Sequence, residues 1–163
     1  FSTVTGIQSL QESFSQLAAA MQSNQALQAS MLVGRSVLAP GDKGALDANA
    51  PLSGAVDLPA STTELTLNVY DAGGQLVRRL PLGAQAAGLV QFSWDGITDR
   101  GERAAPGTYR VRAEALTADG QTGLQTLMKT RVESVSLGRA GEGLTLNLAG
   151  LGPVALADVK QIL

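Results

Sequence analysis

The sequence predicts a mainly β protein with a long α-helix at its N-terminal end. Apolar side chains in residues 1–31 recur at intervals of three and four, the spacing of one face of an α-helix. From residue 32 onward, short apolar runs are separated by Gly, Pro, Asn and Asp, which is typical of strands and tight turns. The composition suits short strands and a thin core, because 19 residues are Gly and only 4% are aromatic.

We expect the helix to run from about residue 5 to residue 31, which is roughly 40 Å at 1.5 Å per residue. Its only charged residue is Glu12, whereas a solvated surface helix usually carries many ion pairs. Two interpretations stay open: the helix folds back on its own domain, or its apolar stripe is an oligomerisation or docking surface. The candidate contact residues on that stripe are Ile7, Leu10, Phe14, Leu17, Met21 and Met31.

Several short strands at spacings of roughly 8 to 12 residues predict a β-sandwich between about residues 54 and 131. Apolar and polar residues alternate with strand period in 65–70 and again in 109–115. The residues at 71–74 are expected to form a hairpin turn, with glycines available for positive φ. Trp94, the single Trp, alternates with apolar neighbours and is expected to face the core.

The flanking segments 32–53 and 132–163 are each too small to form a core alone. We therefore expect them to pair with each other, with the sandwich inserted between them. The predicted division is an N-terminal helix (1–31), a discontinuous β domain (32–53 plus 132–163) and an immunoglobulin- or fibronectin-like sandwich (54–131). Short linkers near 51–54 and 131–133 would join the two β domains.

The composition argues against catalysis, and we expect no enzyme, catalytic residue, cofactor or small-molecule substrate. Cys and His are both absent, which removes thiolate chemistry, the commonest general base and the commonest transition-metal ligand. Asp95, Asp99 and Glu102 lie close together in sequence but do not match a calcium loop, so no metal is expected. No apolar run approaches the roughly 20 residues of a membrane span.

The charge pattern argues against nucleic acid as a partner, because the formal net charge is -2 and basic residues are sparse. Four arginines are predicted on exposed strand faces, where they either serve solubility or contribute to protein docking. They are Arg78, Arg79, Arg110 and Arg112.

Two motifs in the sandwich region resemble a known family. The first is an aromatic-Asp-x-x-Gly hairpin, and the second is Trp-Asp-Gly followed by Pro-Gly-Thr-Tyr. Their order, together with the flanking FSTVTGIQSL, MLVGRSVL and VESVSLGRAGEGLTLNL, is similar to flagellar hook-capping proteins over nearly the whole chain. The motif residues are Tyr70, Asp71, Gly74, Trp94, Asp95, Gly96, Pro106, Gly107 and Tyr109.

The resemblance implies a Tudor-like β-barrel built from the two flanking segments, with the immunoglobulin-like domain inserted. It implies a homo-oligomeric cap that guides hook subunits into place, outside the cell, at the distal end of the growing hook after export through the flagellar secretion channel. It also implies that the sequence is a fragment lacking an N-terminal region. The alternative is a surface- or carbohydrate-binding immunoglobulin-like module of a secreted bacterial protein, which would display exposed aromatic residues.

Overall fold

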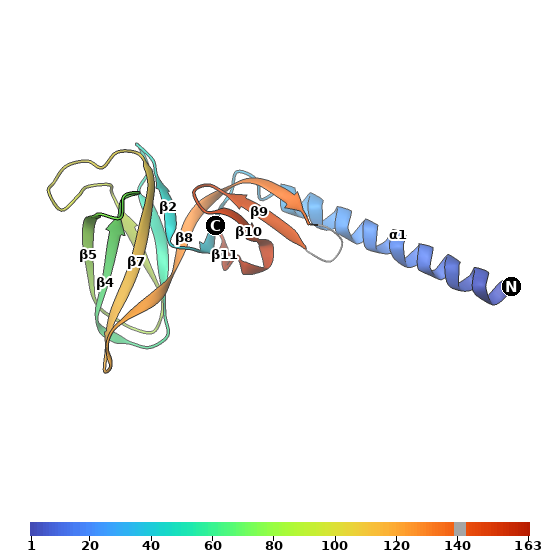
Figure 1. Ribbon diagram of the computed structural model, residues 1–163, viewed down its shortest axis with the longest axis horizontal. Helices are drawn as coiled ribbons and strands as arrows, with labels where there is room; N and C mark the ends of the chain where they lie inside the picture. The colour runs from blue at the N-terminus through green and yellow to red at the C-terminus, as the bar shows by residue number, and fades with distance from the viewer. Residues whose placement is uncertain (139–142) are drawn as a thin grey trace.

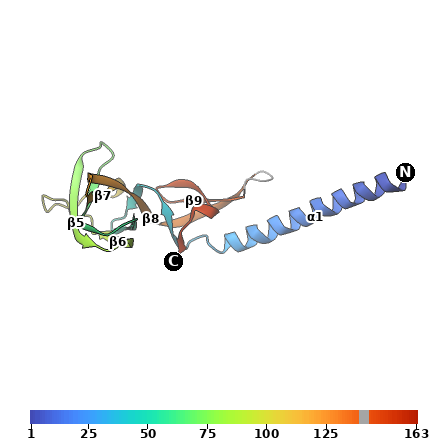
Figure 2. The same ribbon diagram turned by 90° about the horizontal axis from the view of Figure 1, so that it is seen from below.

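The computed structural model describes residues 1–138 and 143–163. Within them the chain forms one α-helix, α1 (Ser2–Ser30), followed by short strands, which confirms the predicted class. Figure 1 shows α1 projecting from the β part as a separate rod, with the N-terminus at its far end, and Figure 2 shows the same after a 90° turn. No helix in the described residues combines the length and the hydropathy needed to cross a bilayer.

The β part consists of antiparallel strands, most of them short, and one 3-10 turn. The strands are β1 (Ser36–Pro40), β2 (Lys43–Leu46), β3 (Leu52–Leu58), β4 (Thr62–Tyr70), β5 (Leu76–Gln85), β6 (Gly88–Trp94), β7 (Gly107–Thr117), β8 (Gly120–Leu137), β9 (Leu144–Leu148), β10 (Gly152–Ala155) and β11 (Gln161–Ile162). The 3-10 turn, η1 (Leu156–Asp158), lies between the last two strands.

The larger β region, here called the two-layer unit, is formed by β2 to β7 and the first part of β8. One layer has the order β2-β7-β4-β5, and the other joins β6 to β3 and β3 to β8. Apolar side chains from both layers meet in a single core, which includes Val56, Leu67, Phe92, Trp94, Val111 and Met128. The predicted alternation in 109–115 is confirmed, because Tyr109, Val111, Ala113 and Ala115 are buried and the residues between them are not. In 65–70 the apolar positions Leu65, Leu67 and Val69 are buried as predicted, but Asn68 is buried too.

The smaller β region, here called the small unit, is formed by β1, the end of β8 and β9 to β11. Here the two flanking segments pack together: β1 pairs with β11, with Val37 opposite Ile162. The buried core of the unit consists of Val37, Ala39, Val132, Leu146 and Leu148. The strands and turns expected from residue 32 onward include residues 139–142, which lie outside the described residues.

Strand β8 belongs to both units. Its first residues pair with β7, its middle pairs with β3 and β1, and its end pairs with β9. The expected linker at 131–133 is therefore wrong, because these residues lie inside one continuous strand of 18 residues. Met128 packs in the core of the two-layer unit and Val132 in that of the small unit, on the same side of β8. A hydrogen-bonded strand, not a flexible connection, joins the units.

Candidate functional site

Helix α1 is almost entirely uncovered. Ala29, at 2% exposure, is its one buried residue. The six candidate contact residues of the stripe are between 56% and 75% exposed: Ile7, Leu10, Phe14, Leu17, Met21 and Met31. The chain therefore presents this row of apolar side chains to solvent.

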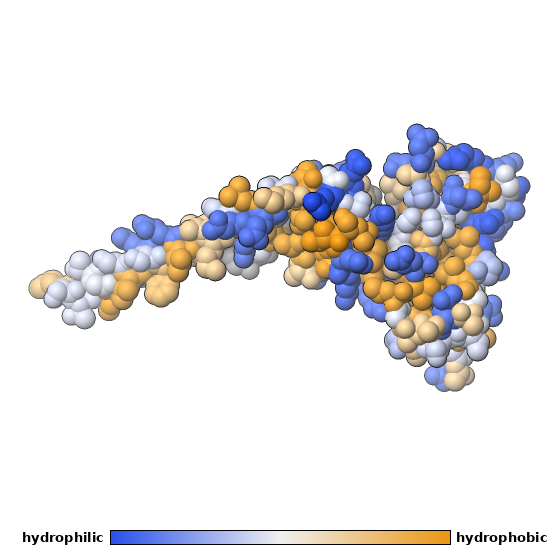
Figure 3. Space-filling model, turned by 180° about the vertical axis from the view of Figure 1, so that it is seen from behind, coloured by the Kyte–Doolittle hydropathy of each residue, from blue (hydrophilic) through white to orange (hydrophobic). Residues whose placement is uncertain are grey.

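The geometry of the helix brings five of these side chains together and separates the sixth. At 100° per residue, Ile7, Leu10, Phe14, Leu17 and Met21 fall within an arc of about 80°. The next positions on that arc are Gln25 and Gln28, which end the stripe where the helix meets the small unit. Met31 lies just beyond the helix, as its C-cap, and is displaced from the arc. In Figure 3 orange side chains recur along the lower edge of the projecting helix.

The C-terminal end of α1 is fixed to the small unit. The Gly34 amide donates to the Val132 carbonyl at 2.8 Å, and the Val132 amide donates to Arg35 at 2.9 Å. Gly34 has φ of 83°, which only a glycine adopts without strain, so the chain turns sharply after the helix. Leu32 packs against the core of the small unit. The helix is thus anchored at one end and free along its length.

The local sequence does little to stabilise α1 by itself. Phe1, at the N-cap, makes no side-chain capping bond, the first turn has no acidic residue and the last turn has no basic one. Most helices in proteins gain their stability from packing of an amphipathic face, and that face is uncovered here. The helix gains most if its stripe is covered by another protein surface.

The first motif forms the hairpin between β4 and β5. The Asp71 amide donates to the Gln75 carbonyl and the Asp71 carboxylate accepts from the Gln75 amide, both at 2.9 Å. Gly74 has φ of 82°, which explains the glycine at this position. Tyr70 lies before the turn, half-buried, on the outer face of the layer.

The second motif organises the loop after β6. Trp94 is 1% exposed, so its predicted core position is confirmed, and its indole nitrogen donates to the Ile97 carbonyl at 2.8 Å. The Asp95 carboxylate accepts from the Ile97 amide at 2.9 Å, and Gly96 has φ of 85°. Asp99 accepts from the Arg79 amide at 3.2 Å and contacts Arg78 at 3.5 Å. Both carboxylates hold the loop in place.

The Pro106-Gly107 segment leads into β7 and to Tyr109. The Tyr109 ring packs edge-on against Trp94, with centroids 5.1 Å apart and planes at 72°. Its hydroxyl donates to the Ala105 carbonyl at 2.6 Å, which ties the strand to the loop before it. These contacts give the second motif a structural role, since its aromatic side chains are turned into the core.

The four predicted surface arginines do not all share one face. Arg78 turns toward the 97–99 loop, where it donates to the Thr98 carbonyl at 3.4 Å. Arg79, Arg110 and Arg112 lie on the outer face of the β2-β7-β4-β5 layer. Sequence reasoning missed Lys43, which joins them through the pairing of β2 with β7. Residues 43–46 are exposed and buried in turn, but this alternation is seen only in the structure.

The aromatic residues do not form an exposed platform on the β units. Phe92, Trp94 and Tyr109 are buried in the core of the two-layer unit. Phe1 and Phe14 lie on the exposed helix, so Tyr70 is the aromatic residue that the β surface displays. A carbohydrate-binding surface usually needs several aromatic rings in a row, so this arrangement argues against the alternative function.

A mainly β chain that holds out an anchored helix with an uncovered apolar face has the architecture typical of proteins that contact other proteins. The comparisons with known proteins agree with this class. The family model of the FlgD Ig-like domain matches residues 41–119. The chain is 32% identical to the basal-body rod modification protein FlgD of Escherichia coli (strain K12), over 99% of this chain and 72% of that protein. It is 30% identical to FlgD of Salmonella typhimurium over the same shares.

Solved structures give the same result. The crystal structure of FlgD from Pseudomonas aeruginosa superposes with a TM-score of 0.73 at 43% identity, covering 80% of this chain and 97% of that one. FlgD from Xanthomonas campestris, described in connection with the hook capping essential for flagellar assembly, superposes with a TM-score of 0.73 at 36% identity, covering 85% and 99%. The chain belongs to the FlgD family of flagellar hook-capping and basal-body rod modification proteins.

Proposed function

We propose that the chain is a non-catalytic scaffold that caps the growing flagellar hook and promotes ordered assembly of hook subunits. One observation carries the mechanism: a member of the FlgD family holds out an anchored helix whose apolar stripe is uncovered. In this proposal the stripe joins copies of the chain, and the β units present surfaces to the hook. The cap acts outside the cell, at the distal end of the hook, after export through the flagellar secretion channel.

The energy available to the stripe supports self-association. Complete burial of a Leu, Ile, Met or Phe side chain contributes about 1.5–3 kcal/mol. The five side chains on the arc are 56–69% exposed, so covering them would add about 5–9 kcal/mol per copy. Association of two copies costs an estimated 4–15 kcal/mol in lost freedom of motion. Two stripes packed together can offset that cost, but without a large excess, which suits a cap that moves as subunits add beneath it.

The proposed domains are the helix (1–31), a Tudor-like β domain (32–53 plus 132–163) and an immunoglobulin-like domain (54–131). The small unit supports the discontinuous domain, because its core takes Val37 and Ala39 from the first segment and Leu146 and Leu148 from the second. The pairing of β2 with β7 favours assigning residues 43–46 to the immunoglobulin-like domain. The hydrogen bond from the Tyr109 hydroxyl back to Ala105 resembles the tyrosine corner of immunoglobulin folds.

A helix-face variant tests the role of the stripe. In the 163-residue chain, the triple substitution L10Q/F14Q/L17Q makes the stripe polar and keeps good helix formers. By sedimentation across a concentration series, we expect the wild-type chain to associate and the triple variant to stay monomeric. A variant that associates as strongly as wild type would show that another surface joins the copies.

Electron microscopy of labelled chain mixed with polymerised hooks tests the cap itself. We expect the wild-type chain at one end of each hook and a sharp loss of end binding in the triple variant. Label spread along the sides of the hooks, or a complex with a half-life of many hours, would contradict a moving cap at the tip.

A further inference from the structure

A basic face lies on the two-layer unit, far in sequence from the helix. It is the outer face of the β2-β7-β4-β5 layer, and strand register fixes its members. Lys43 stands directly opposite Arg110, and Asn68 stands between Arg112 on one side and Arg79 on the other. Four cations therefore gather on one face of a chain whose formal net charge is -2. One carboxylate shares that face: Glu114, which accepts from the Asn68 side-chain amide at 3.4 Å.

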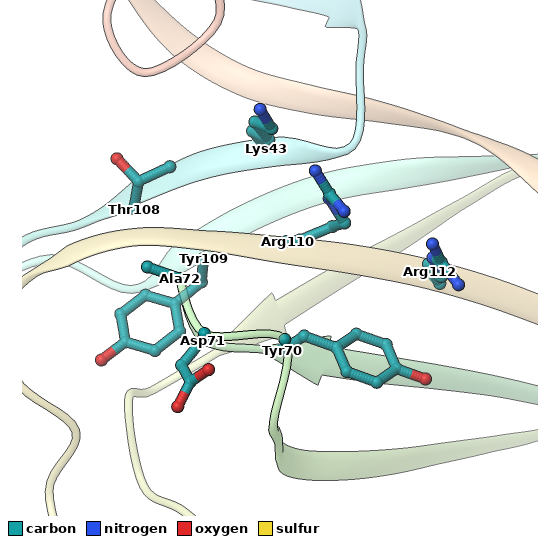
Figure 4. A pocket seen from close by; sticks show the side chains of 10 residues that line it. Lys43, Tyr70, Asp71, Ala72, Thr108, Tyr109, Arg110 and Arg112 are labelled. Carbon is teal, nitrogen blue, oxygen red and sulfur yellow. The ribbon is translucent and has the colours of Figure 1, made fainter.

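The centre of this face is hollowed. A depression of about 430 Å³ is lined by Lys43, Tyr70, Thr108, Arg110, Arg112 and the hairpin 71–74. Figure 4 shows the ends of Lys43, Arg110 and Arg112 on one side of β7, while the Asp71 carboxylate is turned away from them. That carboxylate is occupied by the Gln75 amide of its own turn. The hollow therefore presents cations, and the carboxylate within its lining, that of Asp71, is aimed elsewhere.

The positive charge of the hollow is only partly balanced within the chain. Asp42 contacts Arg110 at 3.2 Å. The Arg112 guanidinium lies 5.7 Å from the centre of the Tyr70 ring, a cation–π contact that adds no negative charge. Among the described residues, Lys43 and Arg112 have no ion-pair partner. Like charges directly opposite each other on neighbouring strands are unfavourable, as Lys43 and Arg110 are, so a bound carboxylate would relieve that repulsion.

We propose that this hollow binds an acidic polypeptide segment in extended conformation, with carboxylates at alternate positions. Arg110 and Arg112 lie two residues apart on one strand face, a separation of about 6.8 Å at 3.4 Å per residue. An extended peptide presents every second side chain at the same spacing. Each guanidinium can hold one carboxylate through two hydrogen bonds, and Lys43 adds charge at the side of the row.

This binding surface is independent of the helix stripe and of the proposed cap. The chain could act as a cap even if the hollow bound no acidic segment. Equally, the hollow could bind an acidic segment even if copies of the chain did not associate. The two ideas are therefore tested by different variants and different measurements.

The test titrates the 163-residue chain with a ten-residue peptide of alternating Glu and Thr, followed by amide chemical shifts. We expect shifts at residues 43, 70, 110 and 112, and affinity that falls at least tenfold between 50 mM and 500 mM salt, since the contacts are exposed ion pairs. The double substitution K43Q/R112Q should weaken binding at least tenfold. The matched control R35Q/R100Q removes two exposed cations outside the hollow and should change affinity less than twofold.

Several results would overturn the proposal. One is equal affinity for a peptide with Gln in place of Glu, and another is equal weakening by R35Q/R100Q, which would mean general charge attraction. Tighter binding of a ten-nucleotide oligothymidylate at the same residues would assign the face to phosphate. The unperturbed spectrum of each variant away from the substituted residues separates lost binding from lost folding.

Discussion

Replacement of Phe14 by Ala should weaken self-association of the chain strongly and leave its fold intact. Phe14 occupies the middle of the apolar arc of α1 and is 69% exposed in the single chain. Among the described residues no packing depends on this side chain, since the buried residue of α1 is Ala29. Ala also has a higher helix propensity than Phe, so the helix itself should not be weakened.

The size of the effect follows from the exposed surface. Burying a whole Phe side chain contributes about 1.5–3 kcal/mol, so covering the exposed two-thirds contributes about 1–2 kcal/mol. When two copies pair through their stripes, both lose this contribution, for a total of about 2–4 kcal/mol. Since each 1.4 kcal/mol is a factor of ten, the dissociation constant should rise roughly 30-fold to several hundred-fold.

Sedimentation velocity over a concentration series measures this shift directly. The matched control is Gln16→Ala, which introduces the same residue into the same helix on the side away from the arc. We expect the control to associate like the wild-type chain. An unchanged dissociation constant for Phe14→Ala, or an equal loss in the control, would refute the assignment of the stripe as the contact surface.

Two further predictions concern the fold, and chemical denaturation of each variant beside the wild-type chain measures both. Tyr109→Phe removes a buried hydroxyl that donates to a backbone carbonyl at 2.6 Å, so it should lower the free energy of unfolding by about 1–2 kcal/mol. The control Tyr70→Phe removes a hydroxyl that makes no hydrogen bond among the described residues, so it should shift the free energy of unfolding by less than about 0.5 kcal/mol. Equal effects of the two substitutions would contradict the role of the Tyr109 bond. Gly54→Ala would place a Cβ against the Leu127 carbonyl oxygen in the strand next to it, and should cost about 2 kcal/mol or more. Gly123→Ala, where the added Cβ meets nothing within 4 Å, should be neutral or slightly stabilising; a neutral Gly54→Ala would show that β3 and β8 separate easily.

The helix shows what a local sequence pattern predicts and what it leaves open. Its period predicted residues 5–31, and the observed bounds are Ser2–Ser30. The start was placed late because no capping side chain marks it. The pattern also identified which side chains share a face, but not what covers that face. Both interpretations, a helix folded back on its own domain and an oligomerisation or docking surface, require the same apolar spacing. Only the structure shows that the stripe is uncovered within the chain.

The basic face is a feature that the sequence could not predict, because strand pairing brings its residues together. Arg78 and Arg79 are neighbours in sequence, but successive residues of a strand point to opposite faces. A register shift between β4 and β5 makes it hard to predict from the sequence which face of the layer each arginine side chain occupies. Lys43 enters the face through pairing with a strand more than sixty residues later. No local signal carries that pairing.

The sequence by itself determined the local elements and which of their side chains face the core. These include the helix, the two well-patterned strands, the hairpin at 71–74 and the inward position of Trp94. These follow from periodicity and turn chemistry, which act over a few residues. The tertiary structure decided which strands are neighbours, and made β8 one strand shared by two cores where a linker was expected. Backbone hydrogen bonds are alike along every strand, so partners are chosen by long-range packing of side chains, and that choice is not encoded in any one segment.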